Sequence, residues 1–177
     1  STDAGGISLR FERSTDGRNW EPVGDSAEVY FGGVSEMAFE FMEDGTLWAL
    51  GRIEDPDPAG MGSTLCTASA SDLGNWRCSE KADPERYDSP EIFRYGNTLY
   101  LVARRDVDGT FGPDGDFLSY SGRAKTTALY SIDTDKERVV HIQDIPGAGD
   151  TAFPAVRRMG DHRFLLANYT SPLDTPE

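Results

Sequence analysis

The chain has 177 residues, of which 37% are hydrophobic and 11% aromatic, enough to bury the core of one domain. Its formal net charge is -14, from 31 acidic and 17 basic residues, which argues against a nucleic-acid partner because such binders carry a basic footprint. No apolar run approaches the roughly 18 residues of a membrane helix, so we expect no membrane partner. The 19 glycines and 10 prolines favour a compact all-β protein with many turns.

The expected elements alternate between two kinds of β-hairpin. Three short apolar strands, each entered through a Gly-containing turn, begin at residues 46, 98 and 162: TLWALGR, TLYLVAR and HRFLLAN. Outer hairpins with an Asp-containing turn alternate with them, and the first of these hairpins precedes residue 46. In chain order we expect an outer hairpin at 7–23, a four-stranded unit at 34–80, another at 87–145 and an inner hairpin at 150–171.

A four-stranded antiparallel unit that recurs at about 50 residues is typical of a β-propeller blade. Half a blade, two whole blades and another half amount to about three blades. Propellers close with about four to eight blades, and three alone would leave unpaired strand edges. We therefore expect half of a six-bladed propeller. It is completed by a complementary half-propeller chain, by a second copy of itself, or by sequence beyond this chain.

Cys66 and Cys78 flank a predicted turn near Asp72. In a hairpin centred there the two cysteines face each other, and cross-strand partners have the Cβ separation that a disulfide needs. The spacing predicts a disulfide and, with it, a secreted or periplasmic location. The alternative is a pair of buried free thiols.

The segment DVDGTFGPDGD, 106–116, concentrates four aspartates between glycines. Oxygen-rich loops of this kind can hold Ca²⁺, although the spacing differs from that of an EF-hand. The alternative is a solvated acidic loop, and no other cofactor is expected to be required. The candidate calcium ligands are Asp106, Asp108, Asp114 and Asp116.

At several of these segments the sequence resembles the sialidase-like six-bladed propellers. STDGRNW, 14–20, resembles their Asp-box, also called the BNR repeat, which is a structural turn far from the active site in that family. SEMAFEFMEDGTLWALGR resembles the segment in which a Glu and an Arg enter the pocket, here Glu36 and Arg52. GDTAFPAV and FLLANYTS, within 149–171, resemble the late segment that brings a Tyr towards the sugar, here Tyr169. The resemblance spans most of the chain but only the C-terminal half of the family domain.

The resemblance implies a secreted, retaining glycoside hydrolase that acts on terminal acidic sugars of glycans. A fork of guanidiniums holds the sugar carboxylate in that family, and a Tyr is the nucleophile. A phenol with a pKa near 10 needs a neighbouring base. Carried over to this chain, Arg52 binds the carboxylate, Tyr169 attacks and Glu36 activates it.

The repeat adds further candidates at the same end of the propeller. Asp88 aligns with Glu36, and Arg104 aligns with Arg52, so the four charged side chains are expected to gather there. The remaining candidate substrate-binding residues are Arg123, a looser match to the family's third arginine, and the aromatic residues Trp48 and Tyr100.

Three further functions stay open at this point. DSPEIFRYGNTLYLV, 88–102, also resembles the Pro-containing hairpin of five-bladed arabinanase and levanase-type glycosidases, which use carboxylates alone. A non-catalytic glycan-binding propeller and an assembly subunit fit the same repeat, because a resemblance of fold does not choose among these functions.

Overall fold

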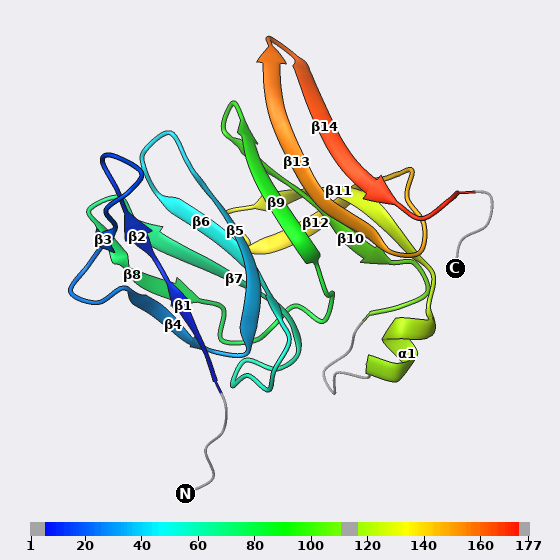
Figure 1. Ribbon diagram of the computed structural model, residues 1–177, viewed down its shortest axis with the longest axis horizontal. Helices are drawn as coiled ribbons and strands as arrows, with labels where there is room; N and C mark the ends of the chain where they lie inside the picture. Colours follow the sequence, from blue (N-terminus) through cyan, green and yellow to red (C-terminus); the bar gives the residue numbers. More distant parts are fainter. Residues whose placement is uncertain (1–5, 111–116, 174–177) are drawn as a thin grey trace, which may run out of the picture.

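The computed structural model describes residues 6–110 and 117–173, and nearly all of its regular structure is β-strand (Figure 1). One short helix, α1 (Phe117–Gly122), follows the second blade's inner hairpin. No helix among the described residues is long and apolar enough to cross a membrane.

Two four-stranded antiparallel sheets form the centre of the molecule, each with its strands side by side in chain order. The first contains β5 (Val34–Phe41), β6 (Leu47–Ile53), β7 (Gly62–Ser69) and β8 (Asp72–Cys78). The second contains β9 (Asp88–Tyr95), β10 (Thr98–Asp106), β11 (Lys125–Asp133) and β12 (Arg138–Ile145). This arrangement is that of propeller blades, so the predicted fold class is confirmed.

Two-stranded sheets flank these blades. The C-terminal one pairs β13 (Thr151–Gly160) with β14 (Arg163–Thr170). At the other end, β1 (Ile7–Arg10) pairs with β4 (Glu28–Gly32), and β2 (Glu12–Arg13) pairs with β3 (Glu21–Pro22). The first hairpin therefore extends past the expected 7–23. Its strand is interrupted at Phe11, whose N–H donates to the Ala27 carbonyl at 2.7 Å.

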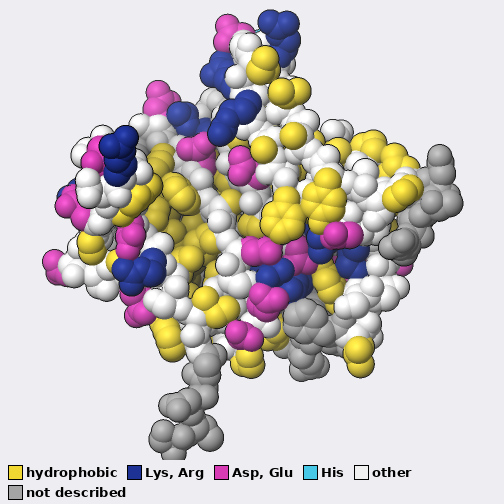
Figure 2. Space-filling model, viewed as in Figure 1, with side chains coloured by type: hydrophobic (Ala, Val, Ile, Leu, Met, Phe, Trp, Pro, Cys, Tyr) yellow, Lys and Arg dark blue, Asp and Glu magenta, His cyan; other side chains and the backbone are white. Residues whose placement is uncertain are grey.

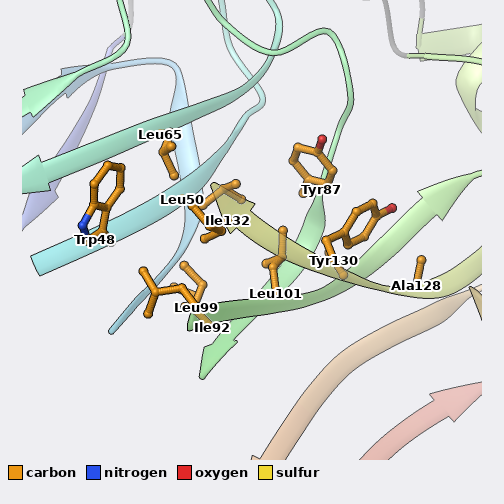
Figure 3. Close-up of a cluster of buried hydrophobic side chains, with 12 residues drawn as sticks. Trp48, Leu50, Leu65, Tyr87, Ile92, Leu99, Leu101, Ala128, Tyr130 and Ile132 are labelled. Carbon is orange, nitrogen blue, oxygen red and sulfur yellow. The ribbon is translucent and has the colours of Figure 1, made fainter. Parts of the chain in front are cut away.

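The main core lies between the two complete blades (Figure 3). Its side chains come from β5, β6 and β7 of one sheet, from β9, β10 and β11 of the next, and from Tyr87 just before β9. Within each strand, alternate residues point to the same face. Burying each Leu or Ile fully contributes about 1.5–3 kcal/mol. The labelled residues of this core include Trp48, Leu50, Leu65, Ile92, Leu99, Leu101, Tyr130 and Ile132.

A second cluster packs on the other face of the first blade, between that blade and the N-terminal hairpin. Phe11 contacts Trp76 edge to face, with ring centroids 5.1 Å apart. Cys66 and Cys78 lie directly opposite each other on β7 and β8 and are joined in a disulfide. The pairing matches the register predicted from the turn.

The segment 14–20 forms a compact turn at the tip of the first hairpin. Asp16 accepts hydrogen bonds from the backbone N–H groups of Arg18 and Asn19, both at 2.8 Å, and these bonds hold its pKa well below the usual range. Ser14 accepts a bond from the N–H of Gly17, whose φ of 71° suits a glycine. Every carboxylate contact here stabilises the turn itself.

Candidate functional site

The innermost strands of the three units lie next to one another, with β9 in contact with both β5 and β13. Each is irregular near its beginning, where the pairing with the following strand shifts by one residue. Ser89 and Phe153, each followed by a proline, have φ values of 50° and 47°, a region that non-glycine residues rarely adopt. Such irregularities bend a strand and redirect its side chains, and they are common beside active sites.

A pocket of about 420 Å³ opens where these three irregular segments meet. Glu36 supplies a carboxylate to its wall and Phe153, which is 65% exposed, supplies an aromatic ring. A second, more apolar cleft of about 360 Å³ lies between the two complete blades, around Leu65 and Val139, and contains none of the predicted site residues. The complete lining of the pocket is Glu36, Met37, Ser89, Pro90, Phe153 and Pro154.

Asp88 is the centre of a charged cluster behind this pocket. Its side chain is 2% exposed and accepts a hydrogen bond from Arg86 Nε at 2.7 Å and another from Arg52 Nη1 at 3.2 Å. Arg104 Nη1 lies 3.9 Å from its second oxygen, to which the Tyr120 hydroxyl also donates. Burial and the neighbouring Asp88 charge raise the pKa of Tyr120, so its hydroxyl stays protonated as a donor.

Glu36 is half-buried at the edge of the same cluster. Its Oε1 lies 3.2 Å from Arg52 Nη1, and its Oε2 accepts a bond from the Ser89 N–H at 2.6 Å. Arg52 Nη2 in turn lies 2.5 Å from a Glu54 oxygen and donates to Ser35 Oγ at 2.8 Å. Arg52 thus joins carboxylates from both blades. Figure 2 shows acidic and basic side chains gathered with hydrophobic ones on this face.

Tyr169 lies close to the pocket, but its partner differs from the expected one. Its hydroxyl donates to Asp150 Oδ1 at 2.7 Å, and its ring stacks on Phe153 with centroids 6.0 Å apart. Arg104 Nη2 donates to the same Asp150 oxygen at 2.8 Å. Partial burial and the bond to Asp150 raise the pKa of Tyr169, which is therefore a neutral phenol at pH 7. The carboxylate bonded to the Tyr169 hydroxyl is therefore that of Asp150, where the sequence predicted Glu36.

Arg123 belongs to a separate pair. Its Nε lies 2.5 Å from Asp106 Oδ2, and its Nη2 donates to the Thr110 carbonyl at 2.9 Å. This pair ties Arg123 to the start of the acidic loop, and its expected part in substrate binding stays a prediction.

The same pair weakens the candidate calcium site. The buried Asp106 carboxylate is occupied by a guanidinium, and Asp108 is bonded to it only through its backbone N–H, at 3.2 Å. The other two expected ligands, Asp114 and Asp116, lie outside the described residues. Among residues 6–110 and 117–173, no group of three or more His, Cys, Asp or Glu could hold a metal ion. Calcium binding stays a prediction.

Trp48 and Tyr100 do not reach the pocket. Trp48 is 8% exposed in the core between the blades, and Tyr100 stacks on Phe93 with centroids 5.4 Å apart. Each precedes its strand's arginine, Arg52 or Arg104, by four residues, which is about 13 Å along an extended strand. The aromatic ring at the pocket is instead that of Phe153, which the sequence pattern did not single out.

Arg86, Glu54, Tyr120 and Asp150 are further site residues that the sequence pattern did not predict. Arg86 and Glu54 each lie two residues from a predicted residue, Asp88 and Arg52, and that proximity was their only signal. Tyr120 comes from α1, which has no counterpart in the first blade.

No protein-family model and no curated protein matches the chain. Solved structures do share its fold. The α-L-arabinofuranosidase Arb93A of Fusarium graminearum, in complex with an iminosugar inhibitor, has a TM-score of 0.53 at 13% identity, over 76% of this chain and 40% of that one. The Bacteroides ovatus xyloglucan PUL GH43B has a TM-score of 0.50 at 16% identity, over 97% of this chain and 36% of that one. The chain thus spans 40% or less of the length of these structures, with which it shares a β-propeller fold.

Proposed function

We propose that the chain contributes the sugar-binding wall of a glycoside hydrolase of propeller fold that acts on a terminal sugar of a glycan. The observation that carries this proposal is that Glu36 and Phe153 line the same pocket. The Asp88 cluster lies behind this pocket and the Tyr169–Asp150 pair lies beside it. A volume of about 420 Å³ is within the range of small-molecule sites. The inhibitor-bound arabinofuranosidase of the same fold supports the proposal.

For the finer function, we propose first an acidic sugar and a Tyr nucleophile. Tyr169 attacks the anomeric carbon, the glycosidic bond breaks, and the phenolic proton passes to Asp150, 2.7 Å away. The aglycone oxygen takes its proton from a group outside the described residues, and water then releases the sugar with retention. Arg52 and Arg104 hold the sugar carboxylate.

A neutral sugar is the second candidate, and the pairing of the arginines favours it. Arg52 Nη1 lies 3.2 Å from both Glu36 and Asp88, and Arg104 Nη2 lies 2.8 Å from Asp150. A sugar carboxylate must displace these partners, whereas neutral hydroxyl groups donate to Glu36 without doing so. Carboxylates alone then carry the reaction, as in the arabinanase-type glycosidases.

Hydrolysis assays separate the two candidates. The complete assembly, with the ring closed, is incubated with a methylumbelliferyl sialoside and with para-nitrophenyl α-L-arabinofuranoside across the acidic to neutral pH range. Sialoside turnover that is lost in Tyr169→Phe supports the first candidate, and arabinofuranoside turnover that is lost in Glu36→Gln supports the second. Binding without product at any pH indicates a non-catalytic glycan-binding propeller, and neither binding nor product overturns the proposal.

We further propose that a complementary half-propeller or a second copy completes the ring. Within the described residues, β14 and β1 each pair on one edge only. The hairpin at 151–170 has three Arg and one Asp, a formal charge of +2, whereas 7–32 has three Arg and five acidic residues, a charge of -2. Figure 2 shows basic side chains near the tip of the projecting β13–β14 hairpin. A native mass of 19.4 kDa for the purified, folded chain would refute this arrangement.

The disulfide supports a secreted or periplasmic location for this protein. Thiol labelling of freshly extracted protein tests the proposal: protected cysteines that react only after reduction are expected, and two freely reactive thiols contradict it.

A further inference from the structure

We propose that Phe153 is a platform on which one face of a sugar ring stacks, and that the irregular start of β13 holds the platform in the pocket. The inference deepens the proposed function, on which it rests for the class of ligand, and it assigns a role to a residue outside the charged cluster. The ligand is a pyranose or furanose ring with one apolar face and hydroxyl groups at its rim.

The side chain of Phe153 is exposed to solvent, although a phenylalanine side chain is expected to be buried. Phenylalanine is among the residues most often buried, yet 65% of this side chain is exposed. Tyr169 stacks beside it with an interplanar angle of 19°, and the Phe153 ring lines the pocket with Glu36. A large exposed apolar surface bordered by polar groups is typical of a binding site.

The backbone that carries the ring is strained. Ala152 and Phe153 have φ values of 123° and 47°, and both are non-glycine residues. Phe153 also precedes Pro154, a position at which steric contact favours extended conformations. Two adjacent residues in rare conformations persist only where the surroundings impose them, and such positions cluster at ligand sites.

Bonds from the preceding residue supply that constraint. The Thr151 carbonyl accepts a bond from Arg104 Nε at 2.6 Å. The Thr151 hydroxyl lies 2.8 Å from that of Thr127 and donates to the Tyr169 carbonyl at 2.7 Å. Both the backbone and the side chain of Thr151 are therefore fixed to neighbouring strands, so that the chain must turn at Ala152 and direct Phe153 outward.

The equivalent place in β9 also has a residue with a positive φ before a proline. Ser89 has a φ of 50° before Pro90, and its N–H donates to Glu36 Oε2 at 2.6 Å. Two strained residues before prolines thus border one pocket, one orienting the carboxylate and the other presenting the ring. The two residues lie on separate strands, so their strained conformations are not one local irregularity. What they share is the pocket that both of them line.

The two groups suit the two parts of a sugar. The face of an aromatic ring carries partial negative charge and attracts the weakly positive C–H groups on the apolar face of a sugar ring. Glu36 accepts hydrogen bonds from hydroxyl groups at the rim, which are stronger for an ionised acceptor.

Binding measurements with three variants test the platform. Phe153→Ala removes the ring, Phe153→Tyr keeps it, and Phe31→Ala is the matched control, because Phe31 is 60% exposed on β4. The probes are the methyl glycosides of sialic acid and L-arabinofuranose, titrated by NMR and assayed for cleavage as aryl glycosides. Phe153→Ala is expected to lower the affinity for the bound sugar about tenfold or more, which is the effect of a binding hot spot. Phe153→Tyr and Phe31→Ala are expected to stay within about threefold of the unmodified protein.

The outcomes distinguish the platform from the proposed function. Unchanged affinity in Phe153→Ala overturns the platform, and if cleavage continues the proposed function stands. Affinity that depends on Phe153, without product from the unmodified protein in its completed ring, overturns the hydrolase and keeps the platform. An equal loss in Phe31→Ala, or the absence of binding by both probes, also overturns the platform. Thermal unfolding of each variant shows that a loss of affinity is not a loss of fold.

Discussion

Replacing Asp88 with Asn removes the one charge that three arginines share. The substitution keeps the shape of the side chain, which is 2% exposed, but leaves Arg86, Arg52 and Arg104 facing a neutral amide. Breaking a buried ion pair by removing one partner costs about 3–5 kcal/mol. Arg52 keeps Glu36 and Glu54, and Arg104 keeps Asp150. We therefore expect the lower end of that range, about 3 kcal/mol.

Thermal unfolding followed by circular dichroism measures this cost. For a chain of this length, about 1 kcal/mol shifts the midpoint by about 2–4 °C, so Asp88→Asn is expected to lower it by about 6–12 °C. The matched control is Asp150→Asn, which also removes a partner of Arg104, but from a side chain that is 71% exposed. Exposed pairs contribute about 0–1 kcal/mol, so the control is expected to shift the midpoint by about 4 °C at most. Equal midpoints for the two variants would refute a central role for Asp88 in stability.

Further measurements test the core, the disulfide, one titrating group and the nucleophile. Trp48→Ala is expected to cost about 3–5 kcal/mol in urea unfolding while folded protein keeps its sugar affinity; lost affinity in folded protein would return Trp48 to the site. Replacing Cys66 and Cys78 with Ser is expected to cost about 2–3 kcal/mol, after which dithiothreitol has no further effect on the unfolding midpoint, and a remaining effect would contradict the assigned bond. Burial, and then Asp83, raise the pKa of Glu85 from 4.5 to about 6, so its contribution to stability is complete below pH 4.5 and is lost as the pH rises through 6. Glu85→Gln is therefore expected to raise the unfolding midpoint at neutral pH but not below pH 4.5, and a pH-independent difference would contradict this pKa. In Tyr169→Phe, sialoside turnover is expected to be abolished with the unfolding midpoint nearly unchanged, and unimpaired turnover would exclude the phenol as nucleophile.

The repeat predicted the charged cluster because its residues follow from strand pairing. Glu36 lies opposite Arg52 on β5 and β6, and Asp88 lies opposite Arg104 on β9 and β10. Both pairs sit at the same distance from their hairpin turns, so equal spacing in the sequence translates directly into equal positions in the blades.

The contacts between units could not be predicted in this way. Asp150 reaches Arg104 across 46 residues, and Tyr120 reaches Asp88 across 32, from segments outside the repeated strands. Trp48 was predicted to bind substrate but lies in the core between the blades. The sequence shows that an aromatic residue lies on the strand, but its type alone does not show how far it lies from the site. Phe153 did have a signal, since Phe153–Pro154 stands on β13 where Ser89–Pro90 stands on β9.

The position of the pocket follows from the geometry of the fold. Blades are related by rotation about a common axis, so equivalent places on successive innermost strands converge near that axis. Here a local shift in pairing at each of three such places turns the strand and presents a different group: the carboxylate of Glu36, the N–H of Ser89 and the ring of Phe153. None of these three residues belongs to the main hydrophobic core. The chemistry of the pocket can therefore change one strand at a time while the packing between blades, which stabilises the fold, is left as it is.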